Sequence, residues 1–175
     1  MTVVVARITD DGFEIAADSI TSLGYTQSKG QNVSHSKLFE TNNMIIGSAG
    51  SAEETSMLRL FANSHRPARA DELAIIEFLS EFVDWKKKKI GAGSINSNIL
   101  LGFEGKVFAI NYWYVTEVLT FEAFGYGGMD FALAAMYLGH SAEKAVETAI
   151  ELSIRCEGPV QLIKYTNPKN EGEKA

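Results

Sequence analysis

The stretch TVVVARITDDGFEIAADS, residues 2–19, decides how the fold begins. Its first apolar run, residues 3–8, is rich in the β-branched side chains that β-strands favour, and a second apolar run follows at residues 13–17. Asp10, Asp11 and Gly12 stand between them, and an Asp-Gly pair in this position is a strong signal for a β-hairpin. The sequence therefore predicts an antiparallel pair of buried strands, with a carboxylate, Asp18, directly after the second.

Beyond this hairpin, the hydrophobic pattern alternates between strands and helices. Ser51 and Glu54 have the spacing of a capping box, and Asp71 and Ser141 are suited to cap further helices. A fourth helix is expected after the glycine-rich residues 125–128. The expected strands are residues 44–48, 98–103, 106–110, 118–124 and 160–165. This order predicts an α+β fold, a four-layer αββα sandwich of two mainly antiparallel sheets between two helix pairs.

Composition limits the class of protein. The 175 residues, 46% of them hydrophobic, predict one globular domain over residues 1–166 and a frayed polar tail over residues 167–175. The net charge of −6 gives no support for a nucleic-acid partner. Neither a signal peptide nor an apolar run near the ~20 residues of a membrane helix is evident. The single cysteine, Cys156, fits a reducing cytoplasm.

Four lysines, residues 86–89, end the helix that follows Asp71. A lysine cluster can bind phosphate, but cations are also favoured at the C-terminus of a helix. We interpret these lysines as a solvated helix end.

Thr2 stands directly behind the initiator Met1. Removal of Met1 is expected before a residue as small as threonine, and it leaves a hydroxyl that carries its own free α-amine. A threonine hydroxyl is a weak nucleophile near neutral pH, and an N-terminal amine beside it can act as its base. With an ordinary pKa of ~8, that amine is partly neutral near pH 7. Thr2 is therefore a candidate nucleophile, although chance also places threonine behind Met in many chains.

Three further residues have both an ordinary and a chemical interpretation. Asp18 at the end of a buried strand is costly unless it is paired, and is otherwise a turn residue. Lys37 opens an apolar stretch, and is otherwise an edge or surface lysine. Gly50 lies where a strand is expected to turn into a helix, and backbone N–H groups there can bind an oxyanion. A tight turn alone also requires glycine, so residue type leaves these alternatives open.

Five short motifs occur in order along the chain: TVVV at residues 2–5, AADS at 16–19, KLF at 37–39, GSAGSAE at 47–53 and AFGYGG at 123–128. Together they resemble the proteasome β-subunits and the HslV-type threonine proteases, which are N-terminal nucleophile hydrolases. The segments SLG at residues 22–24 and Lys29-Gly30 are more similar to the HslV type. The loop before Lys37 is two or three residues longer than in that family. His35 is therefore a rival for the aligned position, although the Leu-Phe pair after Lys37 favours the lysine.

The resemblance implies a catalytic role for each matching residue. The Thr2 hydroxyl attacks a peptide carbonyl, and its α-amine acts as general base through a water molecule. Lys37 lowers the pKa of that amine and of the hydroxyl through its positive charge. Asp18 pairs with Lys37 and fixes its position, and the Gly50 N–H donates to the tetrahedral oxyanion.

Four small residues are implied to bind substrate: Thr21, Ser22, Ser48 and Ala52. Thr21 and Ser22 would pair with an extended peptide by strand addition. Thr21, Ser48 and Ala52 would shape the specificity pocket. Because these side chains are small, medium or large apolar substrate side chains are expected.

Three residues depart from the family pattern or extend it. Tyr126 replaces a serine that the family carries between glycines, and is expected to line a subunit contact or to cover the site. Ser153 stands where the proteasome has a supporting aspartate. Cys156 aligns with an HslV-type cysteine in a loop whose backbone carbonyls can bind a cation. No histidine partner for Cys156 is apparent, so it is not expected to be a nucleophile, and His35, His65 and His140 lack the spacing of metal ligands.

The leading hypothesis is a self-compartmentalising threonine endopeptidase that cleaves peptides or unfolded proteins. Its implied partners are copies of itself in stacked hexameric or heptameric rings, and an ATP-dependent unfoldase. No cofactor is expected, because the chain lacks a phosphate-binding glycine loop and any ATP use would belong to a partner. The alternatives are an inactive ring or scaffold subunit, which Tyr126 favours, and an amidohydrolase that acts on a small amide.

Overall fold

A computed structural model describes residues 2–23, 26–29 and 35–168. Met1 and most of the predicted polar tail lie outside the described residues. The strands are β1 (Thr2–Thr9), β2 (Gly12–Ala17), β3 (Thr21–Leu23), β4 (Thr26–Ser28), β5 (Leu38–Thr41), β6 (Met44–Ala49), β7 (Asn98–Phe103), β8 (Lys106–Asn111), β9 (Tyr114–Glu117), β10 (Phe121–Tyr126) and β11 (Gln161–Thr166). The helices are α1 (Ala52–Ala62), α2 (Glu72–Ile90), α3 (Met129–Tyr137) and α4 (Ala142–Leu152). That residues 1–166 form one domain stays a prediction.

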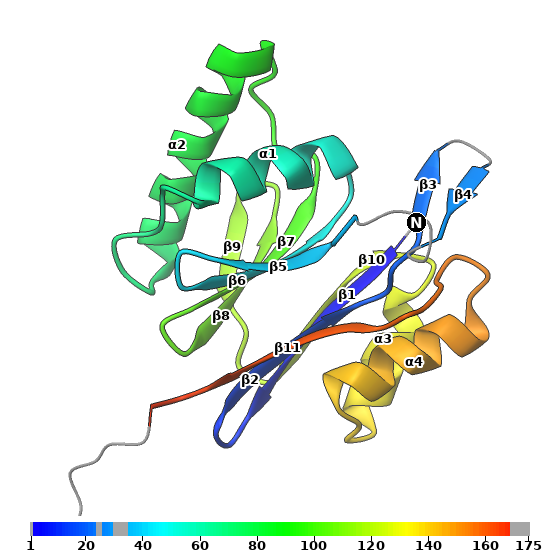
Figure 1. Ribbon diagram of the computed structural model, residues 1–175. Coiled ribbons are helices and arrows are strands. Elements are labelled where there is room, and N and C mark those ends of the chain that lie inside the picture. Colours follow the sequence, from blue (N-terminus) through cyan, green and yellow to red (C-terminus); the bar gives the residue numbers. More distant parts are fainter. Residues whose placement is uncertain (1, 24–25, 30–34, 169–175) are drawn as a thin grey trace, which may run out of the picture.

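The elements form the predicted α+β sandwich of four layers. One antiparallel sheet has the strand order β10-β1-β2-β11, and the other has the order β5-β6-β7-β8-β9. Figure 1 shows α1 and α2 on the outer side of the five-stranded sheet, and α3 and α4 on the outer side of the four-stranded sheet. A separate two-stranded sheet, β3-β4, projects from one end of the sandwich.

Three apolar clusters hold the layers together. The cluster under α1 and α2 is rich in phenylalanine and includes Phe61, Phe78 and Phe82. The cluster under α3 and α4 is built from smaller side chains such as Ala145 and Ala149. The third cluster lies between the two sheets and includes Val4, Ile15, Leu100 and Val107, among others. Strands β1 and β2 are buried on both faces, which explains why their sequences are almost continuously apolar.

The predicted hairpin at the start of the chain is confirmed. Strands β1 and β2 pair antiparallel with Val4 opposite Ala17 and Thr9 opposite Gly12. Residues 10 and 11 form the turn. This register continues past the strand end, where the Asp18 N–H donates to the Val3 carbonyl at 3.2 Å. The hairpin therefore brings the first residues of the chain beside Asp18.

The predicted helix caps are also confirmed. The Ser51 hydroxyl accepts from the Glu54 N–H at 3.2 Å, the Asp71 carboxylate accepts from Ala74 at 2.9 Å, and the Ser141 hydroxyl accepts from Lys144 at 3.2 Å. The Glu54 side chain does not complete a capping box. It instead pairs with Lys86 from α2, and both side chains are buried.

Lys86 corrects the interpretation of the lysine cluster as solvated. Its ammonium donates to Glu54 Oε1 and to the Ser94 carbonyl, and it is only 3% exposed. The second Glu54 oxygen accepts from the Asn96 N–H at 2.8 Å. Only the other three lysines of the run, residues 87–89, are exposed. A buried charge needs a partner, and α1 supplies it to α2 here.

The prediction of a single strand over residues 118–124 was wrong. The chain crosses between the sheets here, because the Val118 N–H donates to Val107 in the five-stranded sheet and the Thr120 carbonyl accepts from Ile8 in the other. β9 thus ends before the crossing and β10 begins after it. Strands β3, β4 and β5 were not expected from the sequence.

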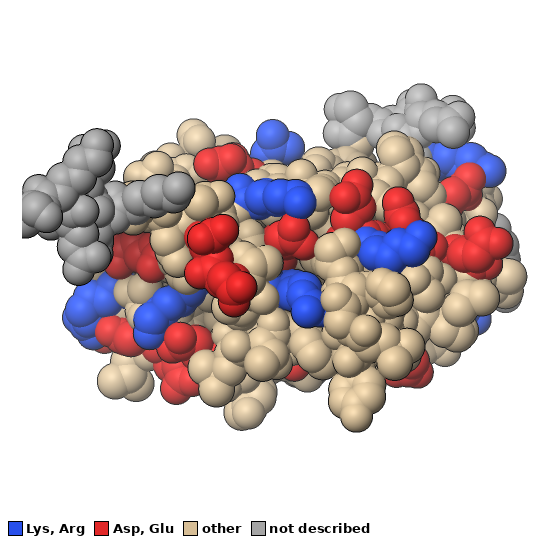
Figure 2. Space-filling model, turned by 90° about the horizontal axis from the view of Figure 1, so that it is seen from below, with Lys and Arg blue, Asp and Glu red and all other residues tan. Residues whose placement is uncertain are grey.

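The surface carries charges of both signs. Figure 2 shows Lys and Arg side chains interspersed with Asp and Glu on the face that it presents, without a broad basic area. Several large apolar side chains on α3, α4 and the turn after α4 are exposed: Tyr137, Leu138, Leu152 and Ile154. Among the described residues, none of the helices combines the length and the apolar character that crossing a membrane would require.

Candidate active site

Thr2, Asp18 and Lys37 come from three separate segments and meet at one carboxylate oxygen. Thr2 opens β1, Asp18 directly follows β2, and Lys37 directly precedes β5. Asp18 Oδ1 accepts from the Thr2 hydroxyl at 2.8 Å and from Lys37 Nζ at 2.7 Å. All three residues are buried, and Asp18 is fully enclosed. The structure therefore brings together the three residues that the sequence singled out most strongly.

The Asp18 carboxylate is fixed by backbone donors as well. Oδ1 also accepts from the Val3 N–H at 2.9 Å. Oδ2 accepts from the N–H groups of Ile20 at 3.3 Å and Glu157 at 3.4 Å. A buried carboxylate with this many donors is compensated for its lost hydration. Its negative charge in turn holds the lysine ammonium beside the Thr2 hydroxyl.

The electrostatics of Lys37 are dominated by its burial. Loss of water lowers the pKa of Lys37 below its ordinary value, and the ion pair and hydrogen bond with Asp18 oppose that shift. Burial also lowers the pKa of His35, and the positive charge of Lys37 adds to this effect. His35 therefore favours its neutral form near pH 7, whereas the pairing with Asp18 favours the ammonium form of Lys37 against the effect of burial.

Gly50 lies at the junction between β6 and α1, where a backbone donor is expected. Its φ of +149° is a conformation that favours glycine. A Cβ at this position would lie 2.7 Å from Ser97 Oγ and 2.8 Å from Ser97 Cα. The Ser97 hydroxyl also accepts from the Ser51 N–H at 3.0 Å. Ser97, which the sequence did not single out, thus supports the backbone of Gly50 and Ser51 from behind.

If the Gly50 N–H binds an oxyanion, as the sequence resemblance implies, replacing Gly50 with alanine should lower kcat for hydrolysis of an amide or peptide substrate by about 10²-fold or more. The new methyl group would collide with Ser97 and displace the backbone N–H from the oxyanion position. Steady-state kinetics should show the loss in kcat with a smaller change in KM. Gly139→Ala is the matched control, because Gly139 also has a positive φ of +95° but a methyl group added there would have no neighbouring atom within 4 Å. Equal activity in the two variants would contradict an oxyanion role for Gly50.

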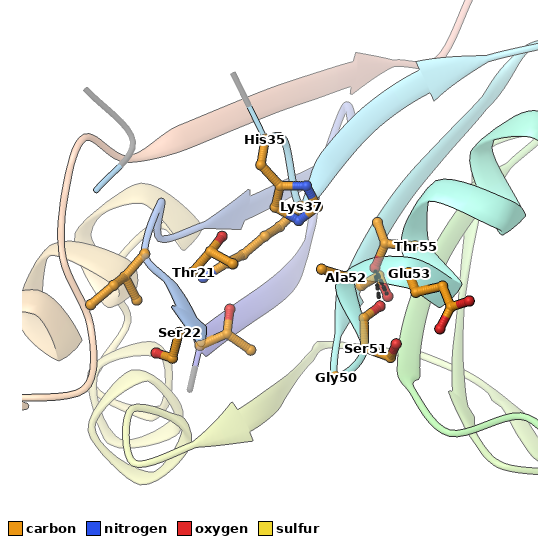
Figure 3. A pocket seen from close by; sticks show the side chains of 12 residues that line it. Thr21, Ser22, His35, Lys37, Gly50, Ser51, Ala52, Glu53 and Thr55 are labelled. Carbon is orange, nitrogen blue, oxygen red and sulfur yellow. Dashed lines mark hydrogen bonds between the residues drawn. The ribbon is translucent and has the colours of Figure 1, made fainter. Parts of the chain in front are cut away.

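The cleft beside Thr2 has a volume of about 320 Å³. Figure 3 shows it between two walls, with Thr21, Ser22, His35 and Lys37 on one side and the start of α1 on the other. All four predicted substrate-binding residues line this one cleft: Thr21, Ser22, Ser48 and Ala52. The structure thus places these residues together with Thr2, Lys37 and Gly50.

Several lining residues were not predicted from the sequence: Ile20, Ser51, Glu53 and Thr55. The Thr55 hydroxyl lies 3.0 Å from both the Ser48 hydroxyl and the Ser51 carbonyl, so it holds one wall in place. His35 was considered only as a rival for the position of Lys37, and it lines the same cleft. The capping spacing at Ser51 and the GSAGSAE motif at residues 47–53 were the sequence signals that pointed to this wall.

The side-chain hydroxyls of Thr21 and Ser22 in this cleft lack hydrogen-bond partners among the described residues. Both hydroxyl oxygens are shielded from water, and neither has a hydrogen-bond partner within the described part of the chain. A shielded hydroxyl without a partner is costly, and a ligand that supplies one relieves the cost. These two side chains are therefore suited to contact a bound molecule.

Tyr126 lies outside the cleft. Its side chain is 69% exposed at the end of β10, in register with Thr2 across the sheet. The Arg155 guanidinium lies 4.8 Å from the centre of its ring, as in a cation–π contact. The phenol therefore does not take the place of a serine hydroxyl beside Asp18. That Tyr126 lines a subunit contact stays a prediction.

Ser153 and Cys156 are both buried. The Cys156 N–H donates to the Ser153 carbonyl at 3.2 Å, and the Ser153 hydroxyl accepts from the Arg155 N–H at 3.1 Å. Burial raises the pKa of the Cys156 thiol to about 11, and the nearby Asp18 charge adds to the shift. A thiol in this state is a poor nucleophile. Within the described ranges no three His, Cys, Asp or Glu side chains are grouped as for a metal ion, and a cation bound by backbone carbonyls here stays a prediction.

The Cys156 thiol predicts a stability change at alkaline pH. Because its pKa is higher in the folded protein than in the unfolded chain, the native state holds the proton more tightly between pH 9 and about pH 11. Relative to Cys156→Ala, the wild type should therefore lose on the order of 2 kcal/mol of unfolding free energy across this range. Denaturant titrations of both proteins at several pH values measure the difference. A difference that stays constant from pH 8 to pH 11 would contradict the buried thiol.

Comparisons with known proteins identify the fold. No protein-family model matches the chain, and no curated protein matches it. Among solved structures, BPH from Thiobacillus denitrificans is similar over 97% of this chain and 100% of that chain, with a TM-score of 0.84 and 22% identity. The same protein in complex with epoxomicin matches over 95% and 100%, with a TM-score of 0.82 and 23% identity. Anbu, an ancestral beta-subunit from Yersinia bercovieri, matches over 94% and 82%, with a TM-score of 0.68 and 16% identity.

These structures correct the expected family. The prediction that the chain belongs with the proteasome β-subunits and HslV-type proteases, on the HslV side, was wrong, because the similar structures named above are BPH and Anbu chains and not HslV. The HslV-like segments were short, and two of their residues, Gly24 and Gly30, lie outside the described residues. At identities below 25%, the similarity establishes the fold: this chain has the four-layer α+β fold of the BPH and Anbu structures.

Proposed function

We propose that this chain is a peptidase whose nucleophile is the hydroxyl of Thr2, exposed at the N-terminus once Met1 is removed. The observation that carries the proposal is the shared oxygen, Asp18 Oδ1, which holds both the Thr2 hydroxyl and the Lys37 ammonium. A purely structural ion pair has no need of a hydroxyl at its centre or of a cleft beside it. Here the hydroxyl faces a cleft that also contains Gly50.

The proposed reaction proceeds in two steps. The Thr2 hydroxyl attacks the peptide carbonyl while its α-amine takes the proton through water, and an ester forms as the new amino terminus of the cleaved peptide leaves with a proton. Water then hydrolyses the ester by the reverse proton path. Lys37 keeps the α-amine neutral by charge repulsion, and the Gly50 N–H stabilises the oxyanion in both steps.

The cleft also supports a peptide as the substrate. Strand β3 carries Thr21 and Ser22 along one wall, and an extended peptide can add to such an edge through backbone hydrogen bonds. The unpartnered hydroxyl oxygens of these two residues would then gain partners from the substrate. Because half of the lining residues carry a hydroxyl, small polar side chains at the cleavage site would fit as well as apolar ones.

A homo-oligomer is the proposed working form. The exposed apolar side chains on α3, α4 and the following turn provide surface that association would bury. The name of the Anbu structures, ancestral beta-subunit, is consistent with an assembly. Stacked hexameric or heptameric rings and an ATP-dependent unfoldase partner are part of this proposal. Native mass spectrometry tests it, and a particle with the mass of one chain would contradict it.

Two alternatives make different predictions. An inactive scaffold subunit would assemble but cleave neither peptides nor small amides. A small-amide hydrolase would cleave simple amides and leave longer peptides intact. The wild-type protein should therefore be incubated with a library of fluorogenic peptides and with short acyl amides. Cleavage of the peptides alone, or of both, supports the proposal, whereas cleavage of the short amides alone, or of neither, contradicts it.

A further inference from the structure

The Gln161 side chain bridges the two segments that carry Asp18 and Lys37. Gln161 is the first residue of β11 and pairs with Ala17, the residue before Asp18. Its Nε2 donates to the Ser19 hydroxyl at 3.0 Å. Its Oε1 accepts from the Leu38 N–H at 3.2 Å, and the Ser36 hydroxyl lies 2.8 Å from the same oxygen. One amide thus contacts a neighbour of Asp18 and both neighbours of Lys37.

This bridge spans a gap between the two sheets. β11 is an edge strand of the four-stranded sheet, and β5 is an edge strand of the five-stranded sheet. Asp18 extends from the first sheet and Lys37 from the start of the second, so their ion pair crosses between separate layers. Small movements of one edge against the other would be enough to separate Lys37 from Asp18. The Gln161 amide resists that movement at the same end of the sandwich.

The orientation of the Gln161 amide is fixed. Its oxygen accepts from the Leu38 N–H and its NH₂ group donates to the Ser19 hydroxyl, so a flipped amide would lose both of these hydrogen bonds. The Ser19 hydroxyl is itself engaged, because it donates to the Pro159 carbonyl at 2.5 Å. The Ser19 N–H donates to the Glu157 carbonyl at 2.8 Å. The bridge is therefore anchored at its Ser19 end by backbone groups of the loop before β11.

We infer that Gln161 is a positioning residue for catalysis, holding the Lys37 segment against the Asp18 segment so that the ammonium stays beside the Thr2 hydroxyl and amine. The inference rests on the proposed function. Gln161 touches neither substrate nor the reacting atoms, and it acts through the ends of β2 and β5. Its loss would let Lys37 move away from Thr2 while leaving the cleft walls at Thr21 and Ala52 in place.

Gln161→Leu tests this role, since leucine has a similar size but no hydrogen-bonding group. We expect kcat to fall at least about tenfold with KM within about twofold, because small misplacements of catalytic groups are costly. The acid limb of the kcat/KM pH profile should also move to higher pH. With Lys37 further away, the pKa of the Thr2 amine rises, and the amine becomes neutral only at higher pH.

Tyr165→Leu is the matched control for stability. Tyr165 lies on the same strand and stacks on Phe13 at a centroid distance of 4.9 Å, far along β11 from the site. The Tyr165→Leu substitution should lower the unfolding free energy without shifting the acid limb of the kcat/KM pH profile. If Gln161→Leu retains kcat within twofold and an unchanged acid limb, the positioning role is wrong. Should Gln161→Leu not fold, Ser36→Ala, which removes one contact of the bridge, must shift kcat and the acid limb in the same directions.

Failure of the proposed function can be distinguished from failure of the inference about Gln161. If the wild type cleaves nothing, the proposed function fails, and NMR of the Lys37 ammonium still tests the bridge. Its protons should exchange with water slowly in the wild type and at least about tenfold faster in Gln161→Leu. Equal exchange rates would overturn the inference.

Discussion

Replacing Thr2 with alanine is expected to lower kcat/KM for peptide hydrolysis at least about a thousand-fold, because no other hydroxyl that lines the cleft has a free α-amine as its base. The hydroxyl is the only atom of Thr2 that the mechanism uses besides its amine. It is buried, and it donates to the Asp18 carboxylate at 2.8 Å. Assays with the best fluorogenic peptide, at saturating and limiting concentrations, measure the loss.

Thr2→Ser is the matched control. Serine keeps the hydroxyl and the α-amine, so it should retain at least a few per cent of the wild-type rate. Thr2→Ala should remain folded, since it removes one hydrogen bond to Asp18 and leaves the Lys37 and Val3 donors in place. Peptide cleavage by Thr2→Ala at the wild-type rate would show that another residue is the nucleophile.

Asp18→Asn is expected to abolish activity and to cost about 3 to 5 kcal/mol of unfolding free energy. The amide keeps the shape of the carboxylate but removes its charge, which leaves the Lys37 ammonium buried without a counter-charge. Lys37 would then lose its proton or move towards water, and its influence on the Thr2 amine would disappear. Denaturant titration and peptide kinetics on the same preparation measure both effects.

Two controls separate the buried pair from ion pairs in general. Glu147→Gln removes the charge from the exposed pair with Lys144, and should change stability by no more than about 0.5 kcal/mol. The double variant Asp18→Asn with Lys37→Met removes both buried charges, so it should recover part of the stability but none of the activity. A stability loss for Asp18→Asn as small as that of Glu147→Gln would contradict the buried ion pair.

The architecture could be predicted because its signals are local. Apolar runs, the Asp10–Gly12 turn and three capping residues set the order of strands and helices, and that order admits few layered arrangements. The crossing between the sheets after Val118 could not be predicted in this way. It depends on which sheet accepts the backbone hydrogen bonds of residues 118–121, and an apolar run looks the same in either sheet.

The candidate site was accessible from the sequence only in part. Thr2, Asp18, Lys37 and Gly50 carry chemistry in their residue types, and their motifs lie at strand ends. Gln161 and Ser97 do not stand out, because each acts through hydrogen bonds to residues more than 40 positions away. Such contacts are set by tertiary packing and leave no trace in hydrophobic periodicity.

The Lys86–Glu54 pair likewise could not be predicted from the local sequence. A lysine in a run of four at a helix end is normally solvated, and its burial follows from a partner 32 residues earlier on another helix. That partner, Glu54, had been interpreted as half of a capping box. The local pattern was real, since Ser51 does cap α1, but the long-range ion pair determined where the carboxylate lies.

The mass of the N-terminal peptide of active protein, after treatment with a covalent inhibitor directed at threonine nucleophiles, tests the central claim most directly. The mature protein should lack Met1, and the compound should be attached to the peptide that begins with Thr2. Thr2→Ala should carry no adduct under the same conditions. Active protein that retains Met1, or an adduct on any other peptide, would contradict a nucleophile activated by its own α-amine.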